Sequence, residues 1–344
     1  MRPLRCAASV LVSNPQSESD MALLEVEKLS VFYHTASGPI RAVRDLSLEL
    51  AAGESLALVG ETGSGKSSVA LALLGLLESS GRAAAGEIRF EGLPLSLANR
   101  RSWNAVRGRK IGIVFQDTRG ALNPILTVGS QLTEALRAHH RMSRKAARET
   151  AAALLADVGI SEPSFYLRRY PSELSGGMCQ RVAIAIAICN QPRLLIADEP
   201  TSALDPSIQA QILELLREMR QRYGLALLLI SHDLALVSEV SDRVAVMYHG
   251  RLVESGRALD VFRRPAHPYA ASLIRCQADL YHRWDQQPLA AIAGSPPAGG
   301  QELPGCCFAP RCLKADPACT ISVPPPATIS DNHWAACLKP TRDS

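Results

Sequence analysis

The chain has 344 residues, of which 47% are hydrophobic and 20% are charged, and its formal net charge is +4. This length allows one large domain plus a smaller one, and the small charge gives no argument for binding nucleic acid. No apolar run approaches the roughly 18 residues that span a bilayer. We therefore expect no transmembrane helix, so any role at a membrane has to come through partner proteins.

The N-terminus is predicted to lie outside the folded part of the chain. Two arginines and the apolar run Ala7–Val12 faintly resemble a secretory signal. The run is too short, however, and Ser13–Asp20 is polar without a convincing cleavage site. We predict a disordered extension over residues 1–20, with Met21 as the functional start.

Three apolar segments predict the first strands. Leu23–Leu29 and Ala42–Leu50 alternate or run apolar, and Ser55–Val59 is short and apolar throughout. The third segment leads directly into Gly60–Ser67, a G-x-x-x-x-G-K-[ST] motif, and Ser67–Leu77 follows as a helix rich in alanine and leucine. A glycine loop between a strand and a helix predicts a phosphate-binding loop rather than a chance glycine-rich turn.

This loop has the residue types that phosphate binding requires. Backbone N–H groups at the start of a helix attract phosphate oxygens, and glycine lets the backbone approach them closely. Lys66 places an ammonium group against the β- and γ-phosphates of ATP, and Ser67 offers its hydroxyl to Mg²⁺. The residues that we predict to hold ATP and Mg²⁺ in this loop are Gly60, Gly63, Ser64, Gly65, Lys66, Ser67 and Ser68.

The middle of the chain is predicted to be a helical insert. Lys110–Phe115 is a further predicted strand. Beyond it, residues 130–158 are rich in alanine, arginine, leucine and glutamate at helical spacing, with Ser143 as a helix N-cap and Gly159 as a stop. We place the insert at about 117–190.

An apolar strand then ends in two acids. Arg193–Ala197 is followed directly by Asp198 and Glu199. A carboxylate at a strand end can hold Mg²⁺, and its neighbour can polarise an attacking water as a general base. We predict the first role for Asp198 and the second for Glu199. Leu225–Ile230 and Asp242–Tyr248 are further buried strands.

Seven motifs in this order resemble those of the ATP-binding-cassette (ABC) superfamily. They include Leu174-Ser175-Gly176-Gly177-Met178, a pentapeptide typical of transporter-type cassettes, and Ile230-Ser231-His232-Asp233. The resemblance implies that ATP is closed between two such chains. The residues that receive a role in this way are Gln116 (Q-loop, sensing Mg²⁺ and the lytic water), His232 (γ-phosphate contact), Ser175, Gly176 and Gly177 (signature, acting on the ATP of the opposite chain), and Ser202 and Asp205 (D-loop, across the dimer interface). With Glu199, Gln116 and His232 form the predicted catalytic set.

An aromatic residue is expected to stack on adenine. Tyr33 lies about where members of the superfamily place this ring. Phe32 is adjacent, and core packing is an alternative role for either ring. We assign the adenine contact to Tyr33.

Three further segments resemble oligopeptide and dipeptide importers. They are Phe115–Asp117 with Ala121–Pro124, His267–Tyr269 after Arg263–Pro265, and Gly305–Cys312. This branch implies ATP-driven import of di- or oligopeptides at the cytoplasmic face of the cell (inner) membrane. The implied partners are two membrane permeases, a second ABC ATPase subunit and an extracytoplasmic substrate-binding protein, but no nucleic acid.

Other functions stay open at this point. The same branch includes importers of nickel and other small solutes, and other subunits select the substrate. A cassette ATPase acting on DNA or ribosomes would carry a coiled-coil insert, zinc fingers within the cassette or a second cassette, and the sequence contains none of these. A regulatory metal-binding protein with a vestigial ATPase would have no need for Lys66, Asp198, Glu199 and His232.

The tail beyond about residue 265 is rich in proline, glycine and cysteine. Cys306, Cys312, Cys319 and Cys337 have the spacing C-x5-C-x6-C-x17-C. Four thiolates in a reducing cytosol can hold Zn²⁺ or a [4Fe–4S] cluster. Structural zinc usually uses C-x2-4-C knuckles, which are absent, and the resemblance to peptide importers with a C-terminal cluster favours iron–sulfur. Free cysteines are the remaining alternative.

The predicted fold class is α/β. It comprises a RecA-like phosphate-loop ATPase core with an antiparallel β subdomain, the inserted helical subdomain, and a small irregular Cys-rich C-terminal domain. The predicted boundaries are 1–20 for the extension, 21–264 for the ABC nucleotide-binding domain and 265–344 for the oligopeptide-transporter-type C-terminal domain.

Overall fold

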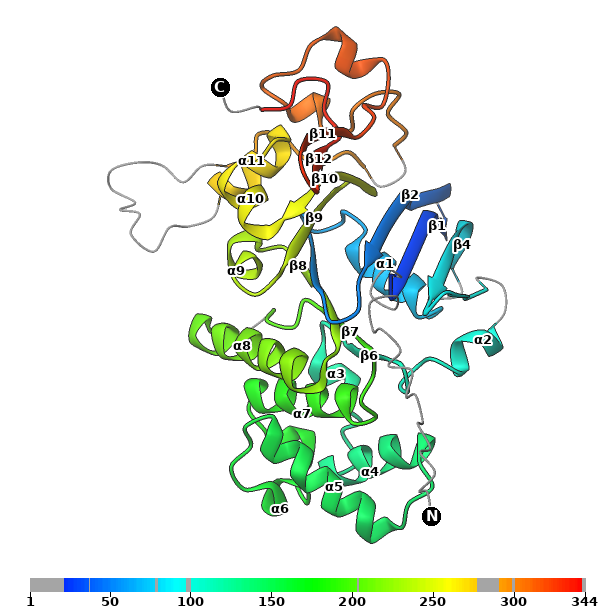
Figure 1. Cartoon of the computed structure of the whole chain (residues 1–344), viewed down its shortest axis with the longest axis vertical. Coiled ribbons are helices and arrows are strands. Elements are labelled where there is room, and N and C mark those ends of the chain that lie inside the picture. The colour runs from blue at the N-terminus through cyan, green and yellow to red at the C-terminus, as the bar shows by residue number, and fades with distance from the viewer. Residues whose placement is uncertain are drawn as a thin grey trace, which may run out of the picture.

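The computed structural model describes residues 22–36, 38–77, 80–96, 100–202, 204–276, 291–298 and 301–341. The predicted N-terminal extension, residues 1–20, lies outside this part. Along the long axis of the molecule, the helical subdomain lies at one end and the C-terminal region, the described residues from 265 onward, at the other. The sheets lie between them (Figure 1).

An eight-stranded mixed sheet forms the centre, in the order β11-β12-β10-β9-β3-β8-β7-β6. Its parallel strands are β3 (Ser55–Val59), β6 (Ile111–Val114), β7 (Leu194–Asp198), β8 (Ala226–Ser231) and β9 (Arg243–Tyr248). The full lengths of β3, β7 and β8 are buried, as expected for parallel strands covered on both faces. Their ends lie within about one residue of the sequence-based prediction, which is the ordinary uncertainty of a strand end.

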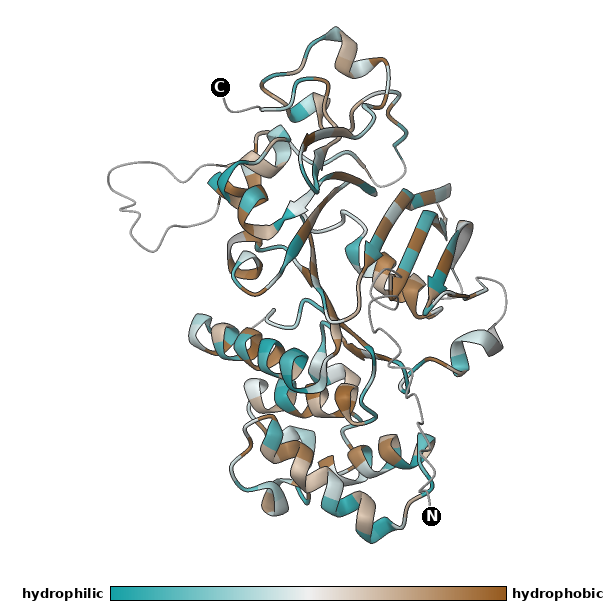
Figure 2. Ribbon diagram, viewed as in Figure 1, coloured by the Kyte–Doolittle hydropathy of each residue, from teal (hydrophilic) through white to brown (hydrophobic). Residues whose placement is uncertain are grey.

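Alternate residues of these strands face two different cores. In β3, Leu56 and Leu58 belong to a core shared with the antiparallel β subdomain. Ala57 and Val59 belong to a second core shared with the helical subdomain. The central strands accordingly carry the hydrophobic colour in Figure 2, whereas much of the outer helical surface is hydrophilic.

The β subdomain is a separate antiparallel sheet in the order β2-β1-β4-β5. Its strands are β1 (Leu24–Thr35), β2 (Gly38–Leu50), β4 (Gly81–Phe90) and β5 (Leu93–Pro94). The first two run longer than predicted, because their pairing continues through polar positions to Thr35 and Gly38. The helix α1 (Lys66–Leu73), which follows the phosphate loop, packs against β1 and β2, and α2 (Arg100–Asn104) follows β5.

The inserted helical subdomain begins after β6. Its elements are α3 (Thr118–Ala121), α4 (Val128–His139), α5 (Arg144–Asp157), α6 (Pro163–Tyr166), the 3-10 turn η1 (Pro171–Glu173) and α7 (Gly176–Ile188). Hydroxyl side chains cap three of the helices: Thr127, Ser143 and Ser175 each accept a hydrogen bond from a backbone N–H three residues later. The predicted N-cap at Ser143 is confirmed.

The remaining elements complete the core and the C-terminal region. They are α8 (Pro206–Tyr223), α9 (Leu234–Ser238), β10 (Arg251–Arg257), α10 (Ala258–Arg263), α11 (Pro268–Arg275), the 3-10 turns η2 (Ala309–Arg311) and η3 (Pro317–Thr320), β11 (Ala327–Ser330) and β12 (His333–Ala335). β12 pairs with β10, with Ala335 opposite Glu254, and β11 pairs with β12. The C-terminal hairpin therefore extends the central sheet. The predicted domain boundaries stay predictions.

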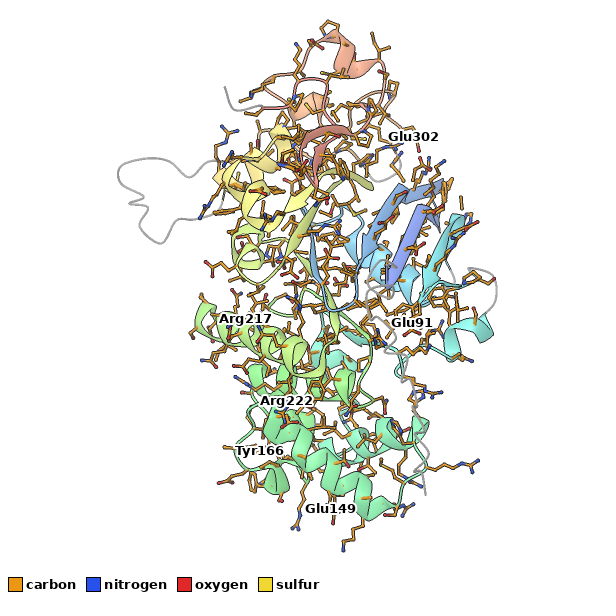
Figure 3. All side chains as sticks on the ribbon, viewed as in Figure 1. Glu91, Glu149, Tyr166, Arg217, Arg222 and Glu302 are labelled. Atoms are coloured by element: carbon orange, nitrogen blue, oxygen red, sulfur yellow. The ribbon has the colours of Figure 1, made fainter. Side chains whose placement is uncertain are left out.

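Polar contacts also hold the C-terminal region in place. The fully buried carboxylate of Glu254 accepts hydrogen bonds from the backbone N–H groups of Ala266 and His267, and its Oε1 lies 2.8 Å from Nε2 of His333. Arg44 of β2 forms an ion pair with Glu302 at 2.7 Å. Figure 3 shows Glu302 at this junction between the C-terminal region and the β subdomain.

Within the described ranges, no helix combines the length and the hydropathy that crossing a bilayer requires.

Candidate nucleotide-binding and hydrolysis site

The phosphate loop lies between β3 and α1, beside the C-terminal end of β9. Gly63 and Gly65 have φ values of +81° and +104°, which lie in the left-handed region that favours glycine. A Cβ atom at Gly60 would collide with the carbonyl oxygen of Met247, and one at Gly65 with that of Ala42. Close backbone approach therefore requires glycine at both positions.

The Lys66 ammonium is held within the loop, whereas the Ser67 hydroxyl contacts the acidic end of β7. The buried Nζ of Lys66 donates to the carbonyl oxygens of Gly60 and Glu61 at 2.7 and 3.0 Å. The Ser67 hydroxyl donates to Oδ1 of Asp198 at 3.2 Å. Ser64 is buried and Ser68 partly buried at the start of α1. The structure thus brings the two predicted Mg²⁺ ligands, Ser67 and Asp198, together.

The three predicted catalytic side chains form one connected group, although they come from three separate strand ends. Nε2 of Gln116 donates to Oε2 of Glu199 at 3.0 Å. Nδ1 of His232 lies 3.6 Å from Oε1 of Glu199, which is an ion-pair distance rather than a short hydrogen bond. Glu199 itself has φ +45°, a backbone conformation that costs energy for a non-glycine residue and is frequent at functional sites.

The electrostatics of this group follow from burial and pairing. The contact with Glu199 raises the pKa of His232, and the same contact lowers the pKa of Glu199. Burial raises the pKa of Asp198, against the hydrogen bond from Ser67 and the charge of Lys66, while the Glu199 charge acts in the same direction as burial. Burial lowers the pKa of Lys66, against the charges of the nearby acids. Glu199 is therefore a carboxylate near neutral pH, as the attack of water on a phosphate requires.

The signature residues lie at the beginning of α7. The exposed Ser175 is the N-cap of this helix, and its hydroxyl accepts a hydrogen bond from the N–H of Met178. Cβ atoms at Gly176 and Gly177 would lie 3.4 Å from Leu204 and 3.0 Å from Ile208, near the start of α8. Both glycines are partly exposed at the N-terminus of this 13-residue helix, the end of a helix that favours an anion.

The D-loop and the aromatic candidate lie at two further places. The Ser202 hydroxyl donates to the carbonyl oxygen of Glu199 at 3.0 Å, and Asp205 is the residue before α8. On β1, Tyr33 is partly buried against the core of the β subdomain, while the neighbouring Phe32 lies under the guanidinium of Arg41 at 5.4 Å. These contacts leave the adenine role of Tyr33 a prediction.

Family models match two parts of the chain. The model described as "ABC transporter" matches residues 43–202, and the model described as "Oligopeptide/dipeptide transporter, C-terminal region" matches residues 253–319. The chain is also 42% identical to the dipeptide transport ATP-binding protein DppD of Escherichia coli (strain K12), over 94% of this chain and 98% of that protein. It belongs to the ATP-binding proteins of the dipeptide and oligopeptide ABC transporters.

Further relatives and solved structures of ABC proteins also match the chain. The oligopeptide transport ATP-binding protein AppD of Bacillus subtilis (strain 168) is 43% identical over 92% of this chain and 96% of its own length. Among solved structures, the dimeric post-hydrolysis state of the ATP-binding cassette MJ0796 bound to ADP and Pi has a TM-score of 0.61 and 26% identity, covering 68% of this chain and 98% of that chain. The cbiO1 protein of Clostridium perfringens has a TM-score of 0.60 and 29% identity, covering 70% and 91%. The RecA-like ABC fold and the ATPase activity predicted from the motifs are confirmed.

Sequence reasoning missed two residues of this ABC ATPase that contact the phosphate loop. The hydroxyl oxygen of Tyr269 accepts a hydrogen bond from the N–H of Glu61 at 2.8 Å. Arg311 forms two hydrogen bonds with the Glu61 carboxylate, from a position 250 residues along the chain. No motif spacing signals contacts of this range.

The four predicted metal-ligating cysteines lie around one cavity. Cys306, Cys312, Cys319 and Cys337 all line it, together with His267. Across the described residues, no three or more histidine, cysteine or acidic side chains have the geometry to hold a metal ion. Burial raises the pKa of Cys306 to about 11 and also raises the pKa of Cys337. Neither the iron–sulfur cluster nor zinc is supported by this arrangement alone.

Proposed function

We propose that this ATPase powers the import of di- or oligopeptides at the cytoplasmic face of the cell membrane. It would act with two membrane permeases, a second ABC ATPase subunit and an extracytoplasmic substrate-binding protein. The observation that carries the proposal is the match along nearly the whole chain to DppD and AppD, whose names specify dipeptide and oligopeptide transport. The match includes the C-terminal region, whose family model is described as that of oligopeptide/dipeptide transporters.

The proposed mechanism assigns one task to each part of the site. Lys66 and the backbone N–H groups of the loop bind the β- and γ-phosphates of ATP. Ser67 and Asp198 hold Mg²⁺, which neutralises phosphate charge when it is bound. Glu199 accepts a proton from the water that attacks the γ-phosphate, while Gln116 orients that water and His232 contacts the γ-phosphate. The chain of contacts from Gln116 through Glu199 to His232 supports this division of labour.

We further propose that each ATP is closed between this chain and a second ATPase subunit. The exposed N-terminus of α7 supports this, because Ser175, Gly176 and Gly177 present helix N–H groups toward the outside of their own chain. The solved MJ0796 relative is a dimer with bound ADP and Pi. In such an arrangement, Ser202 and Asp205 lie beside the interface and connect the two ATP sites.

Reconstitution into vesicles tests the proposal. The complete complex, with ATP supplied on the side of this subunit, should accumulate a labelled dipeptide or a short oligopeptide, and Glu199→Gln should abolish uptake. Nickel and small non-peptide solutes serve as competing substrates. Uptake of nickel in place of peptides would show that the proposed peptide substrate is wrong. ATP hydrolysis without any uptake would overturn the transport function.

For the cysteine cavity we propose a [4Fe–4S] cluster held by Cys306, Cys312, Cys319 and Cys337. The buried His267 is among the other residues that line the cavity, and its Nδ1 accepts a hydrogen bond from the N–H of Tyr269. The proton of the neutral ring therefore lies on Nε2. In the described part of the chain, this buried Nε2 has no hydrogen-bond partner. A donor of this kind fits a group that carries acceptor sulfurs.

Metal analysis tests this second proposal. Protein purified without oxygen should be brown and contain about four iron and four sulfide per chain. Cys312→Ser should bleach it, whereas Cys276→Ser, which changes a cysteine outside the cavity, should not. Colourless wild-type protein with one zinc, or with no metal, would overturn the cluster assignment.

A further inference from the structure

One residue of the phosphate loop, Glu61, is held at its backbone and at its side chain by the C-terminal region. Its N–H donates to the hydroxyl oxygen of Tyr269, at 2.8 Å. Its two carboxylate oxygens accept hydrogen bonds from Nη1 and Nη2 of Arg311, at 2.7 and 3.1 Å. This paired geometry fixes the plane and the distance of the carboxylate more strictly than a single contact would.

The same residue organises the phosphate-binding groups of the loop. The carbonyl oxygen of Glu61 accepts a hydrogen bond from the N–H of Ser64 at 3.1 Å and from Nζ of Lys66 at 3.0 Å. A displacement of Glu61 would therefore move both the backbone turn and the ammonium group that face the phosphates. The C-terminal region therefore contacts the phosphate loop through Glu61.

The Arg311 side chain is built to hold one position. The side chain is 4% exposed. Besides the two bonds to Glu61, Nε donates to the carbonyl oxygen of Ala293 at 2.9 Å, Nη2 to that of Ile292 at 3.4 Å, and Nη1 to the hydroxyl of Tyr248 at 3.3 Å. All five N–H donors of the guanidinium therefore have partners. Such a group has a defined orientation, which it passes on to its carboxylate partner.

The ring cluster behind Arg311 supports this orientation. The rings of Tyr248, Tyr269 and Phe308 pack together with centroids 4.5 to 5.3 Å apart. The guanidinium lies 5.9 Å from the ring centre of Tyr248 and 6.0 Å from that of Phe308. Tyr248 ends β9, a strand of the ATPase core, whereas Phe308 and Arg311 belong to the C-terminal region. The ring cluster therefore links the Arg311 side chain to both the ATPase core and the C-terminal region.

We propose that Arg311, supported by Tyr269, is a positioning residue for ATP hydrolysis: it acts through Glu61 to hold the phosphate loop of its own chain in the ATP-binding conformation. The inference rests on the ATPase function of this chain. It gives the C-terminal region a part in nucleotide binding. A positioning role of this kind needs no contact between Arg311 and the nucleotide.

The test uses the full chain in its assembled complex, with variants on both sides of the contact. Arg311→Met and Glu61→Gln should each raise the ATP KM of the complex and the ATP Kd of the chain on the order of tenfold, since hydrogen bonds to charged groups are worth that much. The value of kcat should change less than KM, because the catalytic group around Glu199 is left unchanged. Arg311→Lys keeps the charge but not the paired geometry, and it should recover only part of the affinity.

Three comparisons separate positioning from general stability. The double variant Arg311→Met with Glu61→Gln should be no worse than either single variant, because both remove the same contact. Tyr269→Phe, which removes only a hydroxyl, should weaken ATP binding about two- to tenfold. Arg275→Ala, at an exposed arginine that donates within its own helix, should leave both KM and Kd unchanged.

Each outcome decides the proposal. Wild-type KM and Kd in Glu61→Gln and Tyr269→Phe, which leave Arg311 in place, would overturn it even if Arg311→Met fails to fold. Additive effects in the double variant would also overturn it. A wild-type complex that hydrolyses no ATP would instead contradict the ATPase function, so the two failures are distinguishable.

Discussion

The two ends of the molecule relate to ATP in opposite ways. The C-terminal region contacts the phosphate loop of its own chain, through Arg311 and Tyr269 on Glu61. The helical subdomain presents Ser175 and two glycines at the exposed start of α7, where their contacts in this chain are to Met178 and to residues near α8. One end contacts the loop, and the other presents an exposed helix N-terminus, for which we propose a role in binding the partner's ATP. In the proposed arrangement, each chain would bind its own ATP but supply only part of the groups that surround the nucleotide.

The largest expected effect concerns the chemistry between these two ends. Glu199→Gln should lower ATP turnover by about 10²- to 10⁴-fold while ATP stays bound, because the general base is lost and the phosphate contacts remain. Turnover of the assembled complex and retention of labelled ATP measure this. Glu149→Gln, an exposed change on α5, is the matched control and should behave as wild type. Turnover at the wild-type rate in Glu199→Gln would exclude Glu199 as the base.

The next largest effect concerns ATP binding by the phosphate loop. Lys66→Ala should weaken ATP binding by the full chain about 10- to 100-fold, because a buried ammonium facing the phosphates is lost. Equilibrium binding of labelled ATP measures the effect. The exposed Lys145→Ala on α5 should leave binding unchanged. Equal affinity of Lys66→Ala and the wild type would contradict the phosphate-loop assignment.

The signature end is tested in a mixed complex. Ser175→Arg, present only in this subunit, should impair hydrolysis of the ATP held by the partner subunit and leave the ATP held by Lys66 in place. An arginine at this helix start removes the N-cap hydroxyl and fills the space toward the anion. Site-specific trapping of labelled nucleotide distinguishes the two sites. Loss of hydrolysis only at the nucleotide bound by the mutated chain would contradict the proposed action of Ser175 on the partner's ATP.

The smallest expected effect concerns how firmly the C-terminal region is attached. Nε2 of His249, at the β9–β10 turn, lies 3.0 Å from the carbonyl oxygen of Gln301 and 3.3 Å from Nη2 of Arg44. Burial lowers the pKa of His249, with the Arg44 charge acting in the same direction and Glu302 and the Gln301 carbonyl opposing it. The folded state therefore binds this proton less readily than the unfolded chain, whose histidine titrates near pH 6.5.

Acid should therefore destabilise the folded protein through His249. The stability contributed at His249 should be present above about pH 6.5 and should be lost as the pH falls below it. Urea unfolding at pH 7.5 and 5.5 measures the free energy of unfolding. His249→Asn suits the left-handed backbone at this position, where φ is +46°, and it should reduce the difference between the two pH values. An unchanged difference would exclude His249 as its source.

The contiguous motifs determined most of the nucleotide site from the sequence alone. The loop Gly60–Ser67, the acidic pair Asp198 and Glu199, and the N-cap at Ser143 depend on neighbouring residues, whose geometry follows from backbone sterics and local hydrogen bonds. Buried strands such as Ser55–Val59 were also predictable, because an unbroken apolar run is stable only when it is buried inside the protein.

The tertiary structure decided which distant groups meet. The contact of Gln116 and His232 with Glu199 depends on the order of β6, β7 and β8 in the sheet. β12 pairs with β10, and Arg311 forms hydrogen bonds with Glu61. Both contacts join segments that share no sequence pattern. Such contacts form because an unpaired buried donor or charge costs free energy, and the identity of the partner depends on which groups the packed elements bring within reach.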